Sequence, residues 1–445
     1  MGFVATVREE AANTPARRNR VVDLWRAVSI LVVVLGHWTM AAVTVRDGGL
    51  VPGHLLVLAG WTHPLTWAFQ VMPVFFLVGG YANGRSWRSA RERATPYGAW
   101  LRGRARRLTL PVVPVLLFWP AAGWLALQAG VDWRTLRLAT SVALVPTWFL
   151  AAYVLVVALA PATVWLWERW GWWSVVAGGL AAGTVDVVSL GSGSVAVGFV
   201  NYLLVWGTLH QLGYAWLDGR LASVARRLLL AGTGLAAAVL LVQAGPYPVS
   251  MVGLDTSAVD NTYPTRVTLL FLGMAQAGLL LLLDPLAGRL VQGRRAWTLV
   301  VAVNARIMTV YLWHVTAMVL VIAASLVVGG VGLRARPLGA SWWWSRPLWF
   351  LVLAVVTTAF VAGLGRLETV GPDPRPAPPA WRPLLAVAGV CAGLAALAVV
   401  GAVDSDGLSW VLFLVPVLAV VAGGLVRRPG LTHDARRAGI TRPRR

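Results

Sequence analysis

The stretch that decides the fold is Arg20–Trp38, which reads RVVDLWRAVSILVVVLGHW. It places an acid, Asp23, and a base, Arg26, at the start of a long apolar run, and a histidine, His37, deep inside that run. About 20 predominantly apolar residues are needed for a helix to cross a bilayer. The stretch therefore predicts a membrane-spanning helix that carries ionisable side chains into the apolar region.

The composition of the whole chain indicates an integral membrane protein. Of its 445 residues 58% are hydrophobic, the mean hydropathy is +0.71, and there are 25 tryptophans. A soluble protein of this size could not cover so much apolar surface. The net charge is +21, and all 38 basic residues are arginines that lie between apolar runs. Because they do not gather on one soluble face, we expect no nucleic-acid partner.

Twelve apolar runs approach the length that a membrane span requires. They predict an all-α, polytopic transmembrane helix bundle, with a ten-span core and two appended C-terminal spans. The fifth and seventh runs are short and rich in glycine and alanine. The runs are 22–45, 64–83, 108–129, 146–167, 172–190, 195–217, 226–243, 266–285, 298–329, 347–365, 383–402 and 408–426.

The arginines also predict how the chain is oriented. With twelve spans, the segments on the side of the N-terminus carry 31 arginines and the segments on the other side carry 7. Arginine is enriched in cytoplasmic segments of membrane proteins. We therefore expect a multi-pass protein of the cell membrane with both termini cytoplasmic.

The domain organisation follows from these runs and from one proline-rich interruption. Its sequence, RLETVGPDPRPAPPAWR, cannot continue a helix and is typical of a stiff linker. The predicted parts are a cytoplasmic N-terminal segment (1–20), the membrane core (21–365), the proline-rich cytoplasmic linker (366–382), two appended spans (383–426) and a basic cytoplasmic tail (427–445).

One face of the first span carries a polar stripe. Arg26 and His37 are eleven residues apart, so at 100° per residue they share a face, about 16 Å apart along the axis. Asp23 lies on the same face. Such a stripe should line an interior cavity rather than contact lipid. The structural alternatives are an interfacial anchor for Asp23 and Arg26, and a helix–helix hydrogen bond for His37.

Further polar residues recur later in the chain. Arg102 and Arg106 are four residues apart, so on a helix they project side by side and form a fork suited to phosphate; the alternative is ordinary cytoplasmic charge. Tyr311 and His314 share one face of the ninth span. His210 is assigned to packing. No pair of histidines or acids has the spacing of a metal site, so we expect no metal.

Taken in order, these residues resemble the type-3 integral membrane acyltransferase family over residues 20 to 365. An Asp-x-x-Arg pair is followed after ten residues by a histidine, the second span ends in Pro-x-Phe-Phe-x-x-x-Gly-Tyr, and an Arg-x-x-x-Arg pair precedes the third span. The matching residues are Asp23, Arg26, His37, Pro73, Phe75, Phe76, Gly80, Tyr81, Arg102, Arg106, Trp148, Tyr311 and His314.

The resemblance implies transfer of an acyl group, often acetyl, from cytoplasmic acyl-CoA across the membrane. The acceptor would be a hydroxyl or amine of an envelope glycan, a lipid or an exported small molecule, and no cofactor would be bound permanently. By position His37 would be the catalytic histidine and Arg26 its companion. Arg102 and Arg106 would lie near the CoA nucleotide, and Asp23, Trp148, Tyr311 and His314 would be substrate-contacting or supporting residues.

One departure and two rival functions remain. The family usually has Ser-Gly before the tyrosine, whereas this chain has Gly79 and Gly80. A multi-pass transporter or flippase for a lipid-linked or polar solute also needs a polar cavity, although it would favour two similar halves. A lipid-linked glycosyltransferase would need acidic residues in the first outer loop, which offers only Asp47.

Overall fold

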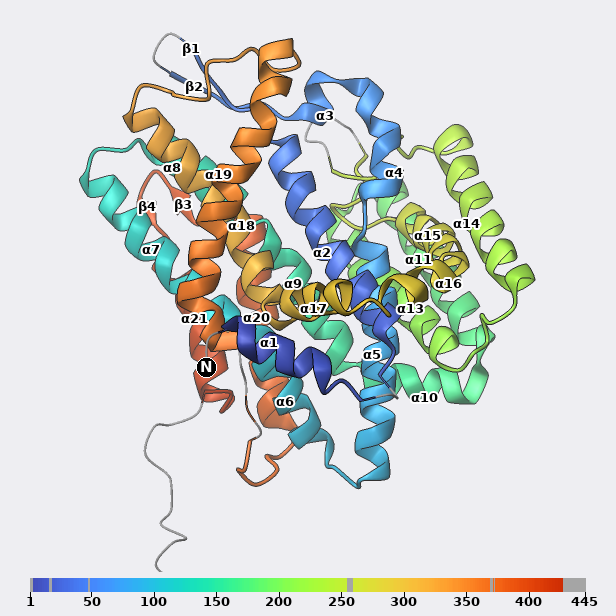
Figure 1. Ribbon diagram of the computed structural model, residues 1–445. Coiled ribbons are helices and arrows are strands. Elements are labelled where there is room, and N and C mark those ends of the chain that lie inside the picture. Colours follow the sequence, from blue (N-terminus) through green and yellow to red (C-terminus); the bar gives the residue numbers. More distant parts are fainter. Residues whose placement is uncertain are drawn as a thin grey trace, which may run out of the picture.

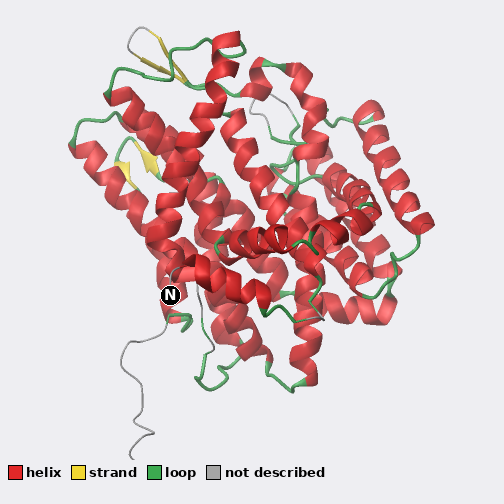
Figure 2. Ribbon diagram, viewed as in Figure 1, coloured by secondary structure: helices red, strands yellow, loops and turns green. Residues whose placement is uncertain are grey.

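The computed structural model describes residues 3–15, 18–46, 49–253, 259–368, 371 and 373–426. Within them the chain is mostly helical, with two short β-hairpins (Figure 2). The elements are α1 (Phe3–Ala12), α2 (Arg20–Met40), β1 (Thr44–Arg46), β2 (Gly49–Val51), α3 (Leu55–Leu58), η1 (Gly60–Leu65), α4 (Thr66–Phe69), α5 (Met72–Glu92), α6 (Tyr97–Thr109), η2 (Leu110–Val112), α7 (Val113–Gln128), α8 (Trp133–Ala143), α9 (Pro146–Ala158), α10 (Ala160–Trp170), α11 (Trp172–Ser192), α12 (Val195–Gly198), α13 (Asn201–Leu217), α14 (Val224–Ala244), α15 (Val267–Leu282), α16 (Asp284–Leu290), α17 (Arg294–Ala305), α18 (Ile307–Val327), α19 (Ala340–Leu364), η3 (Gly365–Glu368), α20 (Trp381–Val400), β3 (Val403–Asp404), β4 (Gly407–Leu408) and α21 (Trp410–Ala422).

The predicted polytopic helix bundle is confirmed. The described chain has ten helices long and apolar enough to cross a membrane, or eleven if α15 and α16, bent by 56°, form one span. The fifth and seventh predicted spans are both among the ten, as Trp172–Ser192 and Val224–Ala244. The twelfth run forms only the 13-residue helix α21, because Leu408 belongs to the β3–β4 hairpin and Gly423 caps the C-terminal end of the helix. The predicted domain boundaries stay a prediction, and the predicted tail, 427–445, lies outside the described residues.

Figure 1 shows that the long helices run roughly along one direction while α1 and α17 lie across them. We call the end at which α2 begins and α5 ends the arginine-rich end. The end at which α2 finishes, beside the β1–β2 hairpin, is called the opposite end. The first span is held from several sides, since α2 packs against α5, α17 and α18.

The close crossing of α5 and α13 depends on small residues. At Gly80 an added Cβ would overlap the backbone oxygen of His210, and at Gly213 it would overlap the backbone of α5. Glycine lets helix backbones approach this closely inside a membrane. The approach places His210 fully inside the bundle, where Asn83 Nδ2 donates to its Nε2 (3.2 Å) and Tyr214 Oη lies 2.9 Å from its Nδ1. These contacts agree with the packing role predicted for His210.

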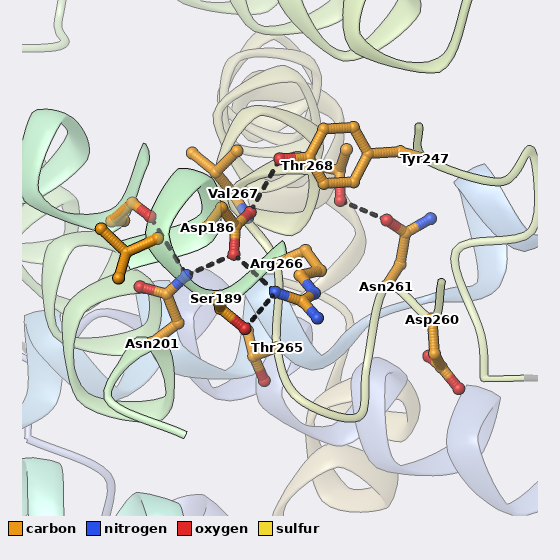
Figure 3. A network of polar contacts seen from close by, with 12 residues as sticks. Asp186, Ser189, Asn201, Tyr247, Asp260, Asn261, Thr265, Arg266, Val267 and Thr268 are labelled. Carbon is orange, nitrogen blue, oxygen red and sulfur yellow. Dashed lines mark hydrogen bonds and ion pairs between the residues drawn. The ribbon is translucent and has the colours of Figure 1, made fainter. Parts of the chain in front are cut away.

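At the opposite end, a buried polar network fastens the segment before α15 to α11 (Figure 3). Asp186 is fully buried and accepts hydrogen bonds from Asn201 Nδ2 (2.8 Å), Tyr247 Oη (3.0 Å) and Val267 N (2.8 Å), and it forms an ion pair with Arg266 (3.3 Å). The partners lie 15 to 81 residues away, and together they satisfy a carboxylate that burial alone would destabilise.

The appended helices pack directly on the core. Helix α20 contacts α6 and α9, and α21 contacts α7. The lone cysteine, Cys391, donates its thiol to the backbone oxygen of Ala151 (3.3 Å). At the arginine-rich end an added Cβ at Gly98 would overlap the backbone oxygen of Pro378, so the linker backbone lies directly on α6.

We predict that Gly80→Ala destabilises the fold, whereas Gly207→Ala does not. The overlap at Gly80 is with backbone, which no rotamer change relieves, so the loss should reach about 3 kcal/mol, the upper part of the usual range for overpacking. An added Cβ at Gly207 meets no atom within 4 Å, and alanine in a helix gains about 0.5–1 kcal/mol over glycine. Thermal unfolding in detergent measures both; equal melting temperatures would contradict the prediction.

Candidate active site

The structure brings two intramembrane histidines together. His37 lies in the last turn of α2 and His314 lies in the first half of α18. His37 Nδ1 is 2.8 Å from His314 Nε2, and the two ring planes are nearly parallel (5°) with centroids 5.1 Å apart. Trp38 strengthens the junction by donating its indole N–H to the backbone oxygen of His314 (3.2 Å). The sequence placed both histidines on polar faces, and the fold makes these faces meet.

The hydrogen bonds of the pair set its proton positions. His314 Nδ1 is 2.7 Å from the backbone oxygen of Tyr311. A carbonyl only accepts, so His314 Nδ1 carries the hydrogen and its Nε2 is the acceptor. His37 must then donate from Nδ1, which leaves His37 Nε2 with a lone pair. In the neutral pair this atom is therefore the proton acceptor that the arrangement offers to a ligand.

Tyr311 and Trp148 have different relations to this pair. Tyr311 is buried, supplies the oxygen that fixes His314, and donates its own hydroxyl to the backbone oxygen of Pro146 (2.8 Å). Trp148 packs edge-to-face against Phe149, which in turn packs on Tyr311. Trp148 therefore supports the histidines indirectly, through the aromatic side chains of α9.

Asp23 and Arg26, near the start of α2, do not form an ion pair with each other, although their spacing would allow one. Asp23 accepts from Arg18 Nε (2.6 Å) instead, and its backbone oxygen accepts from Asn304 Nδ2 (2.9 Å). Arg26 lies within electrostatic range of Arg104 and Glu368. The Asp23–Arg18 ion pair is partly exposed and lies at the start of α2, at the arginine-rich end.

Glu368 connects the foot of α2 with the helix that carries His314. Its carboxylate accepts from Met308 N (2.9 Å), Thr309 N (3.0 Å) and Thr309 Oγ1 (2.8 Å). A carboxylate is favourable at the N-terminus of a helix because it satisfies free N–H groups and complements the dipole. Glu368 therefore fixes the start of α18, and the charge of Arg26 supports it. Sequence reasoning had left Glu368 inside the linker.

A cavity of about 260 Å³ opens between the start of α2 and the middle of α5. Its polar lining includes Arg18, Asn19, Asp23, Tyr81 and Arg85. Within the described chain its lining includes neither Arg26 nor His37. A cavity therefore lies beside Asp23, the first residue of the polar stripe on α2. That this cavity continues to His37 stays a prediction.

Arg102 and Arg106 lie side by side on α6, as their spacing predicted, and both are buried. Each faces Asp373 of the linker, at 3.1 Å from Arg102 Nε and 3.2 Å from Arg106 Nη1. Hydrogen bonds from Arg375, with the charge of Arg102, lower the pKa of Asp373 to about 2. Sequence reasoning treated this segment only as a stiff spacer, although Asp373 is an acid beside arginine-dense α6.

His54 is a further residue whose position the sequence did not reveal. Its backbone pairs with Ala41, and Ala41 N donates to the backbone oxygen of His37 (3.2 Å). The imidazole of His54 lies within electrostatic range of His37. Even so, the described residues contain no group of three His, Cys, Asp or Glu side chains that could hold a metal ion.

Comparison with known proteins assigns the family. The family model described as the acyltransferase domain, that of the acyltransferase 3 family, matches residues 19–366. The chain belongs to the acyltransferase 3 family. It is therefore a membrane acyltransferase that transfers groups other than aminoacyl groups. No curated protein and no solved structure matches the chain.

The structure gives a physical reason for the departure from the family pattern at Gly79. A Cβ added there would lie 2.7 Å from the ring and 2.9 Å from the hydroxyl of Tyr153. Tyr153 accepts a hydrogen bond from Asn83 Nδ2 (3.3 Å). In this chain a tyrosine of α9 therefore fills the space into which a serine side chain of α5 would project.

We predict that His314→Gln lowers the turnover of this acyltransferase roughly 10²-fold, within the range that general acid–base catalysis contributes. The variant removes the imidazole whose acceptor nitrogen orients His37, so kcat should fall while the KM of the acyl donor changes little. Initial-rate kinetics in detergent measure both.

His63→Gln is the matched control, because His63 bonds to the backbone oxygen of Leu56, away from the pair. A fall in turnover of equal size for His63→Gln would contradict the assignment of His314.

Proposed function

We propose that this acyltransferase moves an acyl group, acetyl in the simplest case, from acyl-CoA to a hydroxyl or amine acceptor, with His37 as general base. The single observation that carries the proposal is the 2.8 Å contact from His37 Nδ1 to His314 Nε2. In this contact His37 donates its hydrogen from Nδ1 to His314. The lone pair of His37 Nε2 is then available to accept a proton from the substrate. A neutral imidazole is suited to this task near pH 7.

The proposed acyl transfer needs no reacting groups other than the thioester, the acceptor hydroxyl and His37. His37 Nε2 accepts the proton of the acceptor hydroxyl while that oxygen attacks the thioester carbonyl. The C–S bond then breaks, the acyl group stays on the acceptor, and the thiolate of CoA takes the proton from His37. An acyl-histidine intermediate is the second route, in which Nε2 itself attacks the carbonyl.

The donor side is assigned to the arginine-rich end. A CoA molecule is a polyanion joined to its thioester by a long slender arm, and paired guanidinium groups bind phosphate well. Arg102 and Arg106 are such a pair. The distribution of arginines supports placing this end in the cytoplasm, where acyl-CoA is made.

The acceptor is expected to arrive from the opposite end. His37 is one turn from the end of α2, beside the β1–β2 hairpin. This location supports an acceptor on the far side of the cell membrane, such as an envelope glycan, a lipid or an exported small molecule. The transporter or flippase alternative loses support, because family membership assigns acyl transfer and the two histidines provide a base for it.

We predict that His37→Ala reduces acyl transfer by 10²-fold or more, because the proton acceptor is lost. Inside-out vesicles given labelled acetyl-CoA report the transfer, and the labelled envelope component identifies the acceptor. His63→Ala, made and measured in the same way, should remain active. A His37→Ala protein that accumulates normally and labels the acceptor at the wild-type rate would overturn the mechanism.

We predict that Arg102→Ala raises the KM for acyl-CoA while the KM for acyl-pantetheine, which lacks the nucleotide phosphates, stays unchanged. The reason is that Arg102 would contact only the nucleotide end of the donor. The comparison separates lost phosphate binding from general damage to the fold, since damage would affect both donors. Equal KM values for wild type and variant with acyl-CoA would place the nucleotide elsewhere.

A further inference from the structure

The arginine pair of α6 is covered by a segment that lies outside the matched family domain. Asp373 faces both guanidinium groups, and Arg102 also donates to the backbone oxygens of Arg375 (2.9 Å) and Pro376 (2.8 Å). Arg106 Nε donates to the backbone oxygen of Leu425, three residues beyond the end of α21 (2.9 Å). The side chains of Arg102 and Arg106 are only 8% and 7% exposed. A phosphate therefore cannot reach the pair while the linker is in place.

The contact between the carboxylate and the pair is one that an anion could replace. Arg375 of the linker itself holds Asp373 with several hydrogen bonds, the shortest 2.8 Å from Nη2. Arg102 Nε approaches at 3.1 Å but lacks hydrogen-bond geometry. Among the described residues, three guanidinium groups thus face one carboxylate, so positive charge exceeds negative charge at a place where the side chains of Asp373, Arg102 and Arg106 are at most 10% exposed. Charge-assisted binding of an oxyanion is strong in such surroundings.

Acidification is not what would release the carboxylate. The pKa of Asp373 is lowered to about 2, so the group stays ionised throughout the physiological pH range. Displacement must come from another anion that competes for the same guanidinium groups. The proline-rich sequence around Asp373 restricts the linker backbone, so little entropy is lost when the segment returns to the pair.

We propose that Asp373 is a tethered competitor for the phosphates of the acyl donor, and that linker residues 373–376 must leave the Arg102–Arg106 pair before the donor nucleotide binds there. The inference rests on the proposed donor site. It assigns the segment after the family domain a regulatory role: donor binding and linker release become one coupled event.

The decisive variant is Asp373→Asn, measured with acetyl-CoA and with acetyl-pantetheine. The KM for acetyl-CoA should fall roughly fivefold or more, as for typical coupled ligands, while the KM for acetyl-pantetheine stays unchanged. Asp406→Asn, in the exposed turn between β3 and β4, is the matched control and should change neither value. An unchanged or raised KM for acetyl-CoA in a folded Asp373→Asn protein would overturn the inference.

Two further results separate the possible failures. If Arg102→Ala raises the KM for acetyl-CoA but Asp373→Asn does not lower it, the donor site stands and the competitor role is wrong. If neither donor supports transfer, the proposed function itself fails. Should Asp373→Asn not accumulate, hydrogen exchange at the amides of Asp373, Arg375 and Ala377 in the wild-type protein tests the same point. CoA should speed this exchange, and unchanged or slower exchange would overturn the inference.

Discussion

Every polar group that this chain carries into the apolar region must find its partner within the protein, because the bilayer core offers none. At three places the structure meets this constraint by pairing groups that lie far apart in sequence. His37 pairs with His314, Asp186 with Arg266, and His210 with Asn83. These pairs fix which helix faces meet, and the close crossings at Gly80 and Gly213 allow the faces to approach. The site is thus a product of the same requirement that specifies the bundle.

Much of the fold could be predicted from local features of the sequence. Apolar runs of spanning length and the segregation of arginine depend only on hydropathy and charge, which act residue by residue. The eleven-residue spacing of Arg26 and His37 and the four-residue spacing of Arg102 and Arg106 follow from helix geometry. The bend between α15 and α16 and the shortness of α21 were not predictable in this way, since both depend on where helices break rather than on mean hydropathy.

The composition of the site could be predicted only in part. His314 was recognised as polar and on the right face, but its contact with His37 spans 277 residues and depends on the packing of α2 against α18. The contacts of Glu368 and Asp373 were harder to predict, because both residues lie in the proline-rich linker. The path of such a segment cannot be predicted from helical periodicity. Their partners, the start of α18 and the arginines of α6, are known only once the chain has folded back.

The hydrogen bond from His314 to the backbone of Tyr311 sets which nitrogen of each histidine donates in the pair. A main-chain carbonyl is present whatever residue occupies position 311, and it never donates. The position of the hydrogen on each ring is therefore fixed by the course of the polypeptide itself. Side-chain replacement at 311 would alter the shape of the wall, but only a changed helix path could exchange the donor and acceptor nitrogens of the pair.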